Sequence, residues 1–261
     1  LSSVVALPLV FALACTSSDA SSQDDVAPSA DADGGADAAP RPLRPLATVW
    51  GAPMLVDENP DPNIVEVHLE AGRARATFDG KEIDVFAFNG SVPGPILQAR
   101  PHQRVIVHFK NALDEPTTVH WHGLRTPAEM DGSPRIQTPV PAGGTFTYDF
   151  VLPDAGSFWY HPHVNTHDQL ERGLYGPIVV QGDLDPEYDL ERSIILDDVS
   201  LDATTGEIKP PNLGGFDGLT GRWGNVFLTN GKNAKLATAT AKKGQVERWR
   251  LVNSANARPM P

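Results

Sequence analysis

Apolar and polar residues alternate in short segments along most of the chain from about Trp50 onward. Because side chains of a β-strand point alternately to its two faces, this alternation predicts strands that bury one face in a core. Two of the clearest segments cover residues 104–109 and 146–151. Further predicted strands, some alternating and some apolar throughout, cover residues 64–70, 74–78, 83–88, 158–160, 178–180, 192–196, 226–229 and 246–252.

Turn-forming residues separate these segments. The chain holds 23 glycines and 24 prolines, and the pairs Asn89-Gly90 and Asn230-Gly231 are strong hairpin signals. No long amphipathic helix pattern interrupts the series. Many short strands joined by such turns predict an all-β protein built as a Greek-key β-sandwich.

The predicted strands fall into two groups. Those between residues 45 and 185 suffice for one complete sandwich domain. Residues 186–261 hold only a few strands, whereas a closed sandwich needs about seven. We therefore expect a complete first domain at 45–185 and a truncated second domain at 186–261, in a sequence that is a piece of a longer protein.

The N-terminal region has a different composition. Residues 4–14 form an apolar run that is too short to cross a bilayer, which takes about 20 residues. The run ends at Cys15, so residues 1–15 are predicted to be a signal or lipoprotein leader with a lipid anchor at this cysteine. Residues 16–44 are rich in Ser, Asp and Ala and predict a disordered acidic linker. The expected location is outside the cytoplasm, in the periplasm or at the cell surface; the alternative is an ordinary signal with an incidental cysteine.

Charge and cysteine content exclude several classes of protein. The formal net charge of −12 argues against a nucleic-acid partner, which would need a basic face. The only cysteine is Cys15. The folded body therefore has no disulfide framework, no cysteine-based zinc site and no iron–sulfur cluster.

Four of the eight histidines form two pairs with one residue between them. His120 and His122 flank a tryptophan, and His161 and His163 flank a proline. Residues two apart on a strand share a face, so each pair projects two imidazoles together. If the two pairs lie on neighbouring strands, they form a four-imidazole metal site. Imidazole suits copper, zinc, iron and nickel, and the spacing leaves copper and zinc both open.

The sequence around these pairs resembles the N-terminal copper motifs of the multicopper oxidases. The resemblance is close over residues 60–180 and continues more weakly to residue 258. Its main segments are Phe88-Asn89-Gly90, Pro93-Gly94-Pro95, His120-Trp121-His122-Gly123-Leu124, Met130-Asp131-Gly132, Trp159-Tyr160-His161-Pro162-His163 and Gly173-Leu174-Tyr175-Gly176-Pro177. The resemblance implies cupredoxin-like domains and copper as the cofactor.

The resemblance also implies roles for individual residues. His120 would ligate a type 2 copper, and His122, His161 and His163 would ligate the paired type 3 coppers of a trinuclear cluster that reduces O2 to water. Asp131 matches an outer-sphere acid that assists proton delivery, a role that a nearby carboxylate can fill. The alternative for Asp131 is a turn residue in an Asp-Gly pair.

The other histidines receive no such role. His68, His102 and His108 lie in or near predicted strands and are expected to be surface or sheet residues. His167 lies at a position that the family does not normally use for copper, and it stays unassigned.

Part of the family's copper set is missing from this sequence. The family's type 1 copper needs a Cys and two His from a C-terminal domain, which also supplies four further cluster histidines. We therefore expect a laccase-like oxidase of phenol-like or metal-ion reductants whose type 1 domain lies outside this chain, so that the chain alone is inactive. The alternative is a non-catalytic, exported copper-binding or zinc-binding cupredoxin module.

Overall fold

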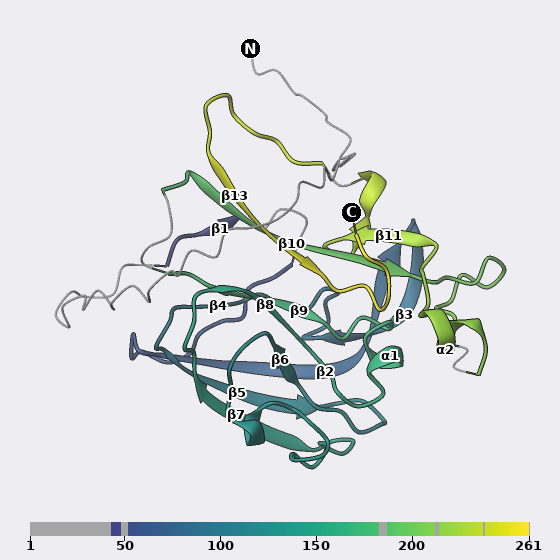
Figure 1. Ribbon diagram of the computed structural model, residues 1–261, viewed down its shortest axis with the longest axis horizontal. Coiled ribbons are helices and arrows are strands. Elements are labelled where there is room, and N and C mark those ends of the chain that lie inside the picture. Colours follow the sequence, from purple (N-terminus) through teal and green to yellow (C-terminus); the bar gives the residue numbers. More distant parts are fainter. Residues whose placement is uncertain (1–42, 48–51, 183–186, 212–213, 237, 261) are drawn as a thin grey trace, which may run out of the picture.

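The computed structural model describes residues 43–47, 52–182, 187–211, 214–236 and 238–260 (Figure 1). The predicted leader at 1–15 and nearly all of the predicted linker at 16–44 lie outside the described residues. Strands dominate the described part and its helices are short, which confirms the all-β prediction. Within the described ranges, no helix combines the length and apolarity needed to cross a membrane.

One four-stranded sheet has the order β3-β2-β5-β7. Its strands are β2 (Ile64–Phe78), β3 (Lys81–Phe88), β5 (Arg104–Asn111) and β7 (Thr145–Val151). The prediction of two strands at 64–70 and 74–78 was wrong, because β2 is one continuous strand. Its ladder passes from one neighbour to the other at Ala71, which pairs with both Asn111 of β5 and Phe88 of β3.

A second four-stranded sheet has the order β4-β9-β8-β6. Its strands are β4 (Leu97–Ala99), β6 (His120–His122), β8 (Gly156–His161) and β9 (Gly176–Val180). The two sheets enclose the main hydrophobic core and form the predicted sandwich. Its largest fully buried side chains include Trp121, Tyr148, Tyr160, Phe88 and Phe109.

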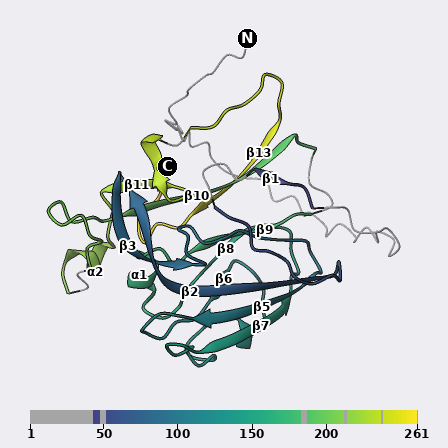
Figure 2. The ribbon, with the colours of Figure 1, turned by 180° about the vertical axis from the view of Figure 1, so that it is seen from behind.

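A third sheet lies on one side of this sandwich, as both ribbon views show (Figures 1 and 2). Its central strand β10 (Leu190–Val199) pairs with β11 (Val226–Thr229), with β13 (Glu247–Asn253) and with the short β1 (Leu46–Ala47). A further short strand, β12 (Lys232–Asn233), pairs with β11. β1 lies at the start of the range 45–185 that we expect for the first domain, but it pairs with β10 of the third sheet.

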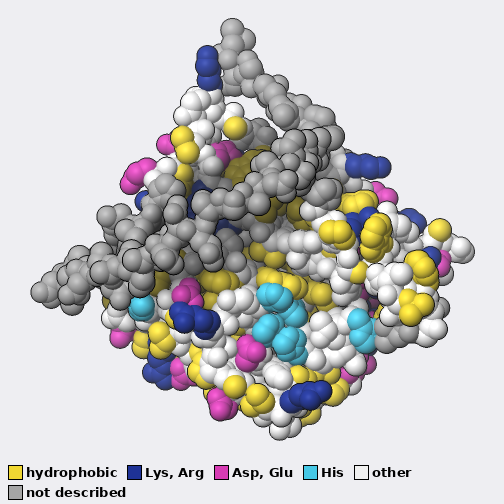
Figure 3. Space-filling view, viewed as in Figure 1, with side chains coloured by type: hydrophobic (Ala, Val, Ile, Leu, Met, Phe, Trp, Pro, Cys, Tyr) yellow, Lys and Arg dark blue, Asp and Glu magenta, His cyan; other side chains and the backbone are white. Residues whose placement is uncertain are grey.

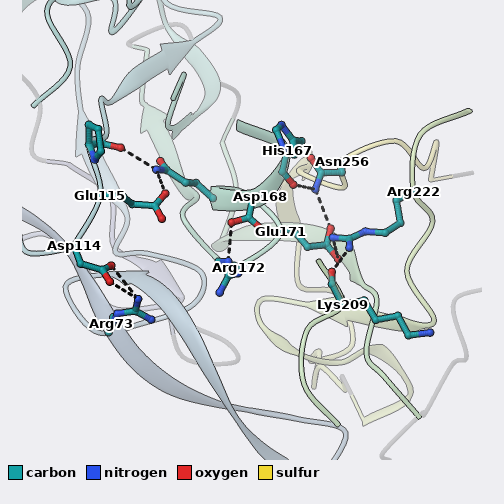
Figure 4. A network of polar contacts seen from close by, with 12 residues as sticks. Arg73, Asp114, Glu115, His167, Asp168, Glu171, Arg172, Lys209, Arg222 and Asn256 are labelled. Carbon is teal, nitrogen blue, oxygen red and sulfur yellow. Dashed lines mark hydrogen bonds and ion pairs between the residues drawn. The ribbon is translucent and has the colours of Figure 1, made fainter. Parts of the chain in front are cut away.

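The third sheet packs against the sandwich at several places, one of them just after the short helix α1 (Thr166–Gln169). Apolar contacts there bring together Leu170 and Ile195, and the carboxylate of Glu171 links several segments (Figure 4). Glu171 accepts hydrogen bonds from the Ser200 backbone N–H at 2.9 Å and from Asn256 Nδ2 at 2.8 Å. Glu171 Oε1 also lies 2.8 Å from Arg222 Nη2. This carboxylate is buried, and both of its oxygens have polar partners.

The two Asn-Gly pairs form the tight turns that the sequence predicts. Asn89 and Gly90 have φ angles of 48° and 72°, and Asn230 and Gly231 have φ angles of 46° and 73°. Two successive positive φ angles are typical of the turns that join antiparallel strands. The remaining helices are also short, and they are η1 (Ala128–Met130), α2 (Phe216–Thr220) and η2 (Ala234–Leu236).

Candidate metal centre

Strand pairing places three of the four predicted histidines side by side. β6 and β8 are antiparallel neighbours, and His120 lies opposite His161 in their register. The residues between and beside them, Trp121 and Tyr160, are opposite each other and buried in the core. Because the strand alternates, His120, His122 and His161 project from the other face of the same sheet.

His163 reaches the same place from just beyond β8. The strand ends at His161, and Pro162 follows it, as expected for a residue that cannot donate to a sheet ladder. The backbone N–H of His163 donates to Thr118 Oγ1 at 3.1 Å, two residues before β6. This bond holds His163 against the start of the neighbouring strand.

The four imidazoles therefore form one cluster, and Figure 3 shows histidine side chains gathered at one place on this face. Ring nitrogens of His120, His161 and His163 lie within 4.8 Å of one another. His122 joins them, since its Nδ1 lies 3.2 Å from His161 Nε2. The rings of His120 and His163 are stacked, with 3.9 Å between centroids.

Hydrogen bonds leave one nitrogen of each of two rings available as a ligand. His120 Nδ1 donates to the Asp131 carbonyl at 2.9 Å, and His161 Nδ1 donates to the Pro162 carbonyl at 3.0 Å. A carbonyl oxygen only accepts, so the proton of each neutral ring lies on Nδ1 and Nε2 carries a lone pair. Metal-binding histidines are commonly oriented in this way by their second nitrogen.

Burial favours the neutral form of three imidazoles, those of His122, His161 and His163. It lowers the pKa of His161 to about 3, and it also lowers the pKa values of His122 and His163. A positive charge on His120 would lower all three further. Neutral imidazole is the form that ligates a metal, so these three rings are competent ligands at neutral pH.

Asp131 lies beside His120. Its carboxylate oxygen Oδ1 is 3.2 Å from His120 Nδ1 and accepts a hydrogen bond from Thr126 Oγ1 at 3.0 Å. The residue follows η1 directly and precedes Gly132, whose φ of 74° makes the turn. Asp131 is thus a turn residue and a neighbour of the cluster at once.

Sequence analysis missed one member of this site, Trp159. Its ring is stacked on His122 with 4.9 Å between centroids and lies 4.2 Å from the His161 ring. Trp159 stands two residues before His161, so the same alternation that pairs the histidines also brings it to their face. His167, left unassigned above, is exposed on α1 and is not among the three histidines with mutually close ring nitrogens.

Comparisons with known proteins show which family the chain resembles. The family model described as multicopper oxidase matches residues 70–185, which include both histidine pairs. The chain carries a multicopper oxidase domain. Multicopper oxidase MmcO of Mycobacterium tuberculosis is 35% identical over 208 residues, which are 70% of this chain and 41% of that protein. Laccase-1 of Cryptococcus neoformans is 35% identical over 192 residues, 69% of this chain and 30% of that protein.

A solved structure gives the same result for the fold. The crystal structure of a multi-copper oxidase from Pseudomonas thermotolerans superposes with a TM-score of 0.67 and 35% identity, over 75% of this chain and 47% of the other. The resemblance to multicopper oxidases and the cupredoxin-like fold are therefore confirmed. The chain spans less than half the length of these relatives.

The donor set of this multicopper oxidase domain fits copper, the metal that the family implies. All four donors are imidazole nitrogens, which suit copper(II). The 3.2 Å between His122 Nδ1 and His161 Nε2 is a separation that two ligands of one ion can take when each bond is about 2.0–2.1 Å long. The same distances would also suit zinc, so the geometry by itself does not distinguish the two metals.

Proposed function

We propose that this chain supplies half of the ligands of a trinuclear copper cluster in an exported, laccase-like multicopper oxidase. The observation that carries the proposal is the convergence of two His-x-His pairs from neighbouring strands on one point. In this proposal His120 ligates the type 2 copper, and His122, His161 and His163 ligate the type 3 coppers. When bound, the copper ions would pass four electrons from the reductant to O2, which is reduced to water.

The chain's own residues position the ligands and handle protons. The carbonyl of Asp131 fixes the ring of His120 so that Nε2 is the ligand atom. The carboxylate of Asp131 is 33% exposed, so it can exchange protons with solvent and hold one beside the cluster. Trp159 packs against two of the rings and limits their rotation.

In this proposal, the site that accepts electrons from the reductant and the remaining copper ligands are parts of the complete oxidase. The proposed type 1 copper and the other four cluster histidines would come from a part of the protein outside residues 1–261. The share of the relatives that this chain covers, 41% and 47% in two cases, supports that view. The proposed reductants are phenol-like molecules or metal ions, and residues 1–261 alone would not oxidise them.

The apolar run before Cys15 supports a role outside the cytoplasm. We propose that residues 1–15 direct export to the periplasm or the cell surface, with lipid attachment at Cys15 and residues 16–44 as a spacer. Mass spectrometry of the mature protein tests the anchor. An acylated Cys15 is expected, and a mature N-terminus beyond it without lipid contradicts the anchor.

A second candidate function is a non-catalytic, exported module that binds copper or zinc. The observation that favours it is that Cys15, the only cysteine of the sequence, lies outside the described residues, which hold the four-imidazole cluster but no cysteine for a type 1 copper. This module would bind metal and would consume no oxygen with any reductant.

Two measurements separate these candidates. The gene is read beyond the codon for Pro261, and its full product is loaded with copper and assayed for oxygen uptake with a phenol and with a reduced metal ion. The proposal predicts further histidines, a type 1 cysteine and oxygen uptake. A full product that binds copper through this cluster but takes up no oxygen favours the module.

A further inference from the structure

A second pair of histidines lies on the other sheet of the sandwich. His68 of β2 and His108 of β5 are direct partners in the parallel register of these strands. Their neighbours Val67 and Val107 are buried in the core, so both imidazoles stand on the outer face. The ring centroids are 5.0 Å apart, and the side chains are 63% and 37% exposed.

Each of these imidazoles faces a carboxylate. His108 Nε2 lies 2.7 Å from Glu66 Oε1, and His68 Nε2 lies 3.4 Å from Glu58 Oε2. The face thus presents two neighbouring imidazole–carboxylate pairs, whose ligand atoms do not all lie within 4.8 Å of one another. Imidazole and carboxylate are the ligands that zinc and copper(II) take in proteins that offer no cysteine.

The loop that precedes β2 fixes the carboxylate of Glu66 and the backbone of Glu58. Asn59 Nδ2 donates to Glu66 Oε2 at 2.7 Å, which leaves Oε1 directed at His108. The Glu58 backbone N–H donates to the Glu66 carbonyl at 2.9 Å, which brings the Glu58 side chain beside His68. Asp57 Oδ1 accepts from the backbone N–H groups of Asn59 and Glu66 and closes the loop. Such supporting hydrogen bonds are typical of groups that orient metal ligands.

Nearby cations do not occupy this position. Arg104 is bound to Asp149, with Nε 2.7 Å from Oδ1, and Lys110 is bound to Glu70 at 2.9 Å. Both basic side chains already have a carboxylate of their own. Arg104 also interacts with the charge of Glu66, and a divalent ion would add to the positive charge that balances Glu58 and Glu66.

We propose that His68, His108, Glu66 and Glu58 form a second metal site, separate from the cluster at β6 and β8, for a divalent ion such as Zn2+ or Cu2+. His108 and Glu66 share a hydrogen-bonded proton in the metal-free protein. An ion bound between the same two atoms displaces that proton to His108 Nδ1, or to solvent where the ring is doubly protonated. His68 and Glu58 are largely exposed, so their side chains can rotate to complete the ligand set. The ion is bound at the protein surface and takes its remaining ligands from water.

Zinc titration of the full chain by calorimetry tests this site. The expected result is a binding event that His68→Ala and His108→Ala each weaken about tenfold or more. Glu66→Gln gives the same result while keeping the side-chain shape and an oxygen for Asn59. His167→Ala, an exposed histidine outside both sites, leaves the event unchanged. Circular dichroism spectra matching the original chain show that each variant is folded.

A further variant separates this proposal from the proposed copper cluster. His163→Ala removes a ligand of that cluster and should leave the surface event intact. If His68→Ala, His108→Ala and Glu66→Gln all bind zinc with the original stoichiometry and affinity, the four residues are surface ion pairs only and the second site is refuted. That result would leave the cluster at β6 and β8 untouched.

Discussion

Gly132, in the turn after η1, packs closely against the backbone that precedes His120. Its φ is 74°, and a Cβ atom placed there would lie 2.2 Å from the Val119 carbonyl oxygen and 2.6 Å from its carbon. These atoms belong to the backbone immediately before His120, so no side-chain rotation relieves the contact. Replacing Gly132 with alanine must therefore push the turn and Asp131 away from the strand.

The magnitude follows from two contributions. Alanine in the left-handed region costs about 1–2 kcal/mol. Forcing an extra carbon into a packed position costs about 1–3 kcal/mol more. Gly132→Ala should thus lower the free energy of unfolding by about 2–5 kcal/mol, a large part of the 5–15 kcal/mol typical of a native protein.

Gly143 provides a matched control. Its φ is 73°, almost the same as that of Gly132, but a Cβ atom there would meet nothing within 4 Å. Gly143→Ala should therefore cost only the left-handed contribution of about 1–2 kcal/mol. The difference between the two variants measures the contact with Val119.

The assay combines urea unfolding with copper titration of both variants. Because Asp131 orients His120, Gly132→Ala should also weaken copper binding by about tenfold or more, whereas Gly143→Ala should not. Equal destabilisation by the two substitutions, together with unchanged copper affinity in Gly132→Ala, would refute the idea that this turn positions His120.

Three other predictions concern single side chains. Trp159→Ala should weaken copper binding about tenfold because the rings of His122 and His161 lose their packing, and Trp159→Phe should restore most of it; equal affinity in a copper titration of all three proteins would contradict this. Asp131→Asn should keep the copper content near normal, because the backbone carbonyl of residue 131 that holds His120 remains. The same substitution should slow oxygen uptake by the complete oxidase, and an unchanged rate would exclude the proton role of the Asp131 carboxylate. Burial raises the pKa of Asp197 from 3.8 to about 7, so the folded chain retains a proton there and loses stability as the pH rises from about 4 through about 7. Asp197→Asn removes this loss of stability. Urea unfolding should show that the free energy of unfolding of the variant, relative to the original chain, rises by up to about 4 kcal/mol between about pH 4 and about pH 7. A difference between the two proteins that does not change with pH would contradict the prediction.

Local pattern was enough to predict the histidine pairs and the fold class. Residues two apart on a strand share a face whatever the rest of the chain does, so His120 and His122 could be paired from spacing alone. The turns at Asn89-Gly90 and Asn230-Gly231 are equally local, because the two residues determine the backbone geometry.

Other features depend on which strands become neighbours, and spacing does not determine that. His120 meets His161 only because β6 pairs with β8. These strands are distant in the sequence, since His122 and His161, whose rings touch, are 39 residues apart. The pairing of β1 with β10 and the meeting of His68 with His108 have the same origin. For this reason His68 and His108 looked like unrelated sheet residues in the sequence, and the structure brings them together.

The central claim is that His120, His122, His161 and His163 hold copper, and anomalous diffraction tests it most directly. Crystals of the chain grown with copper(II) would be measured just above and just below the copper absorption edge. The account predicts an anomalous peak among the four imidazoles, within bonding distance of His161 Nε2 and His122 Nδ1. Copper found elsewhere on the protein, with these four rings free of any peak, would contradict it.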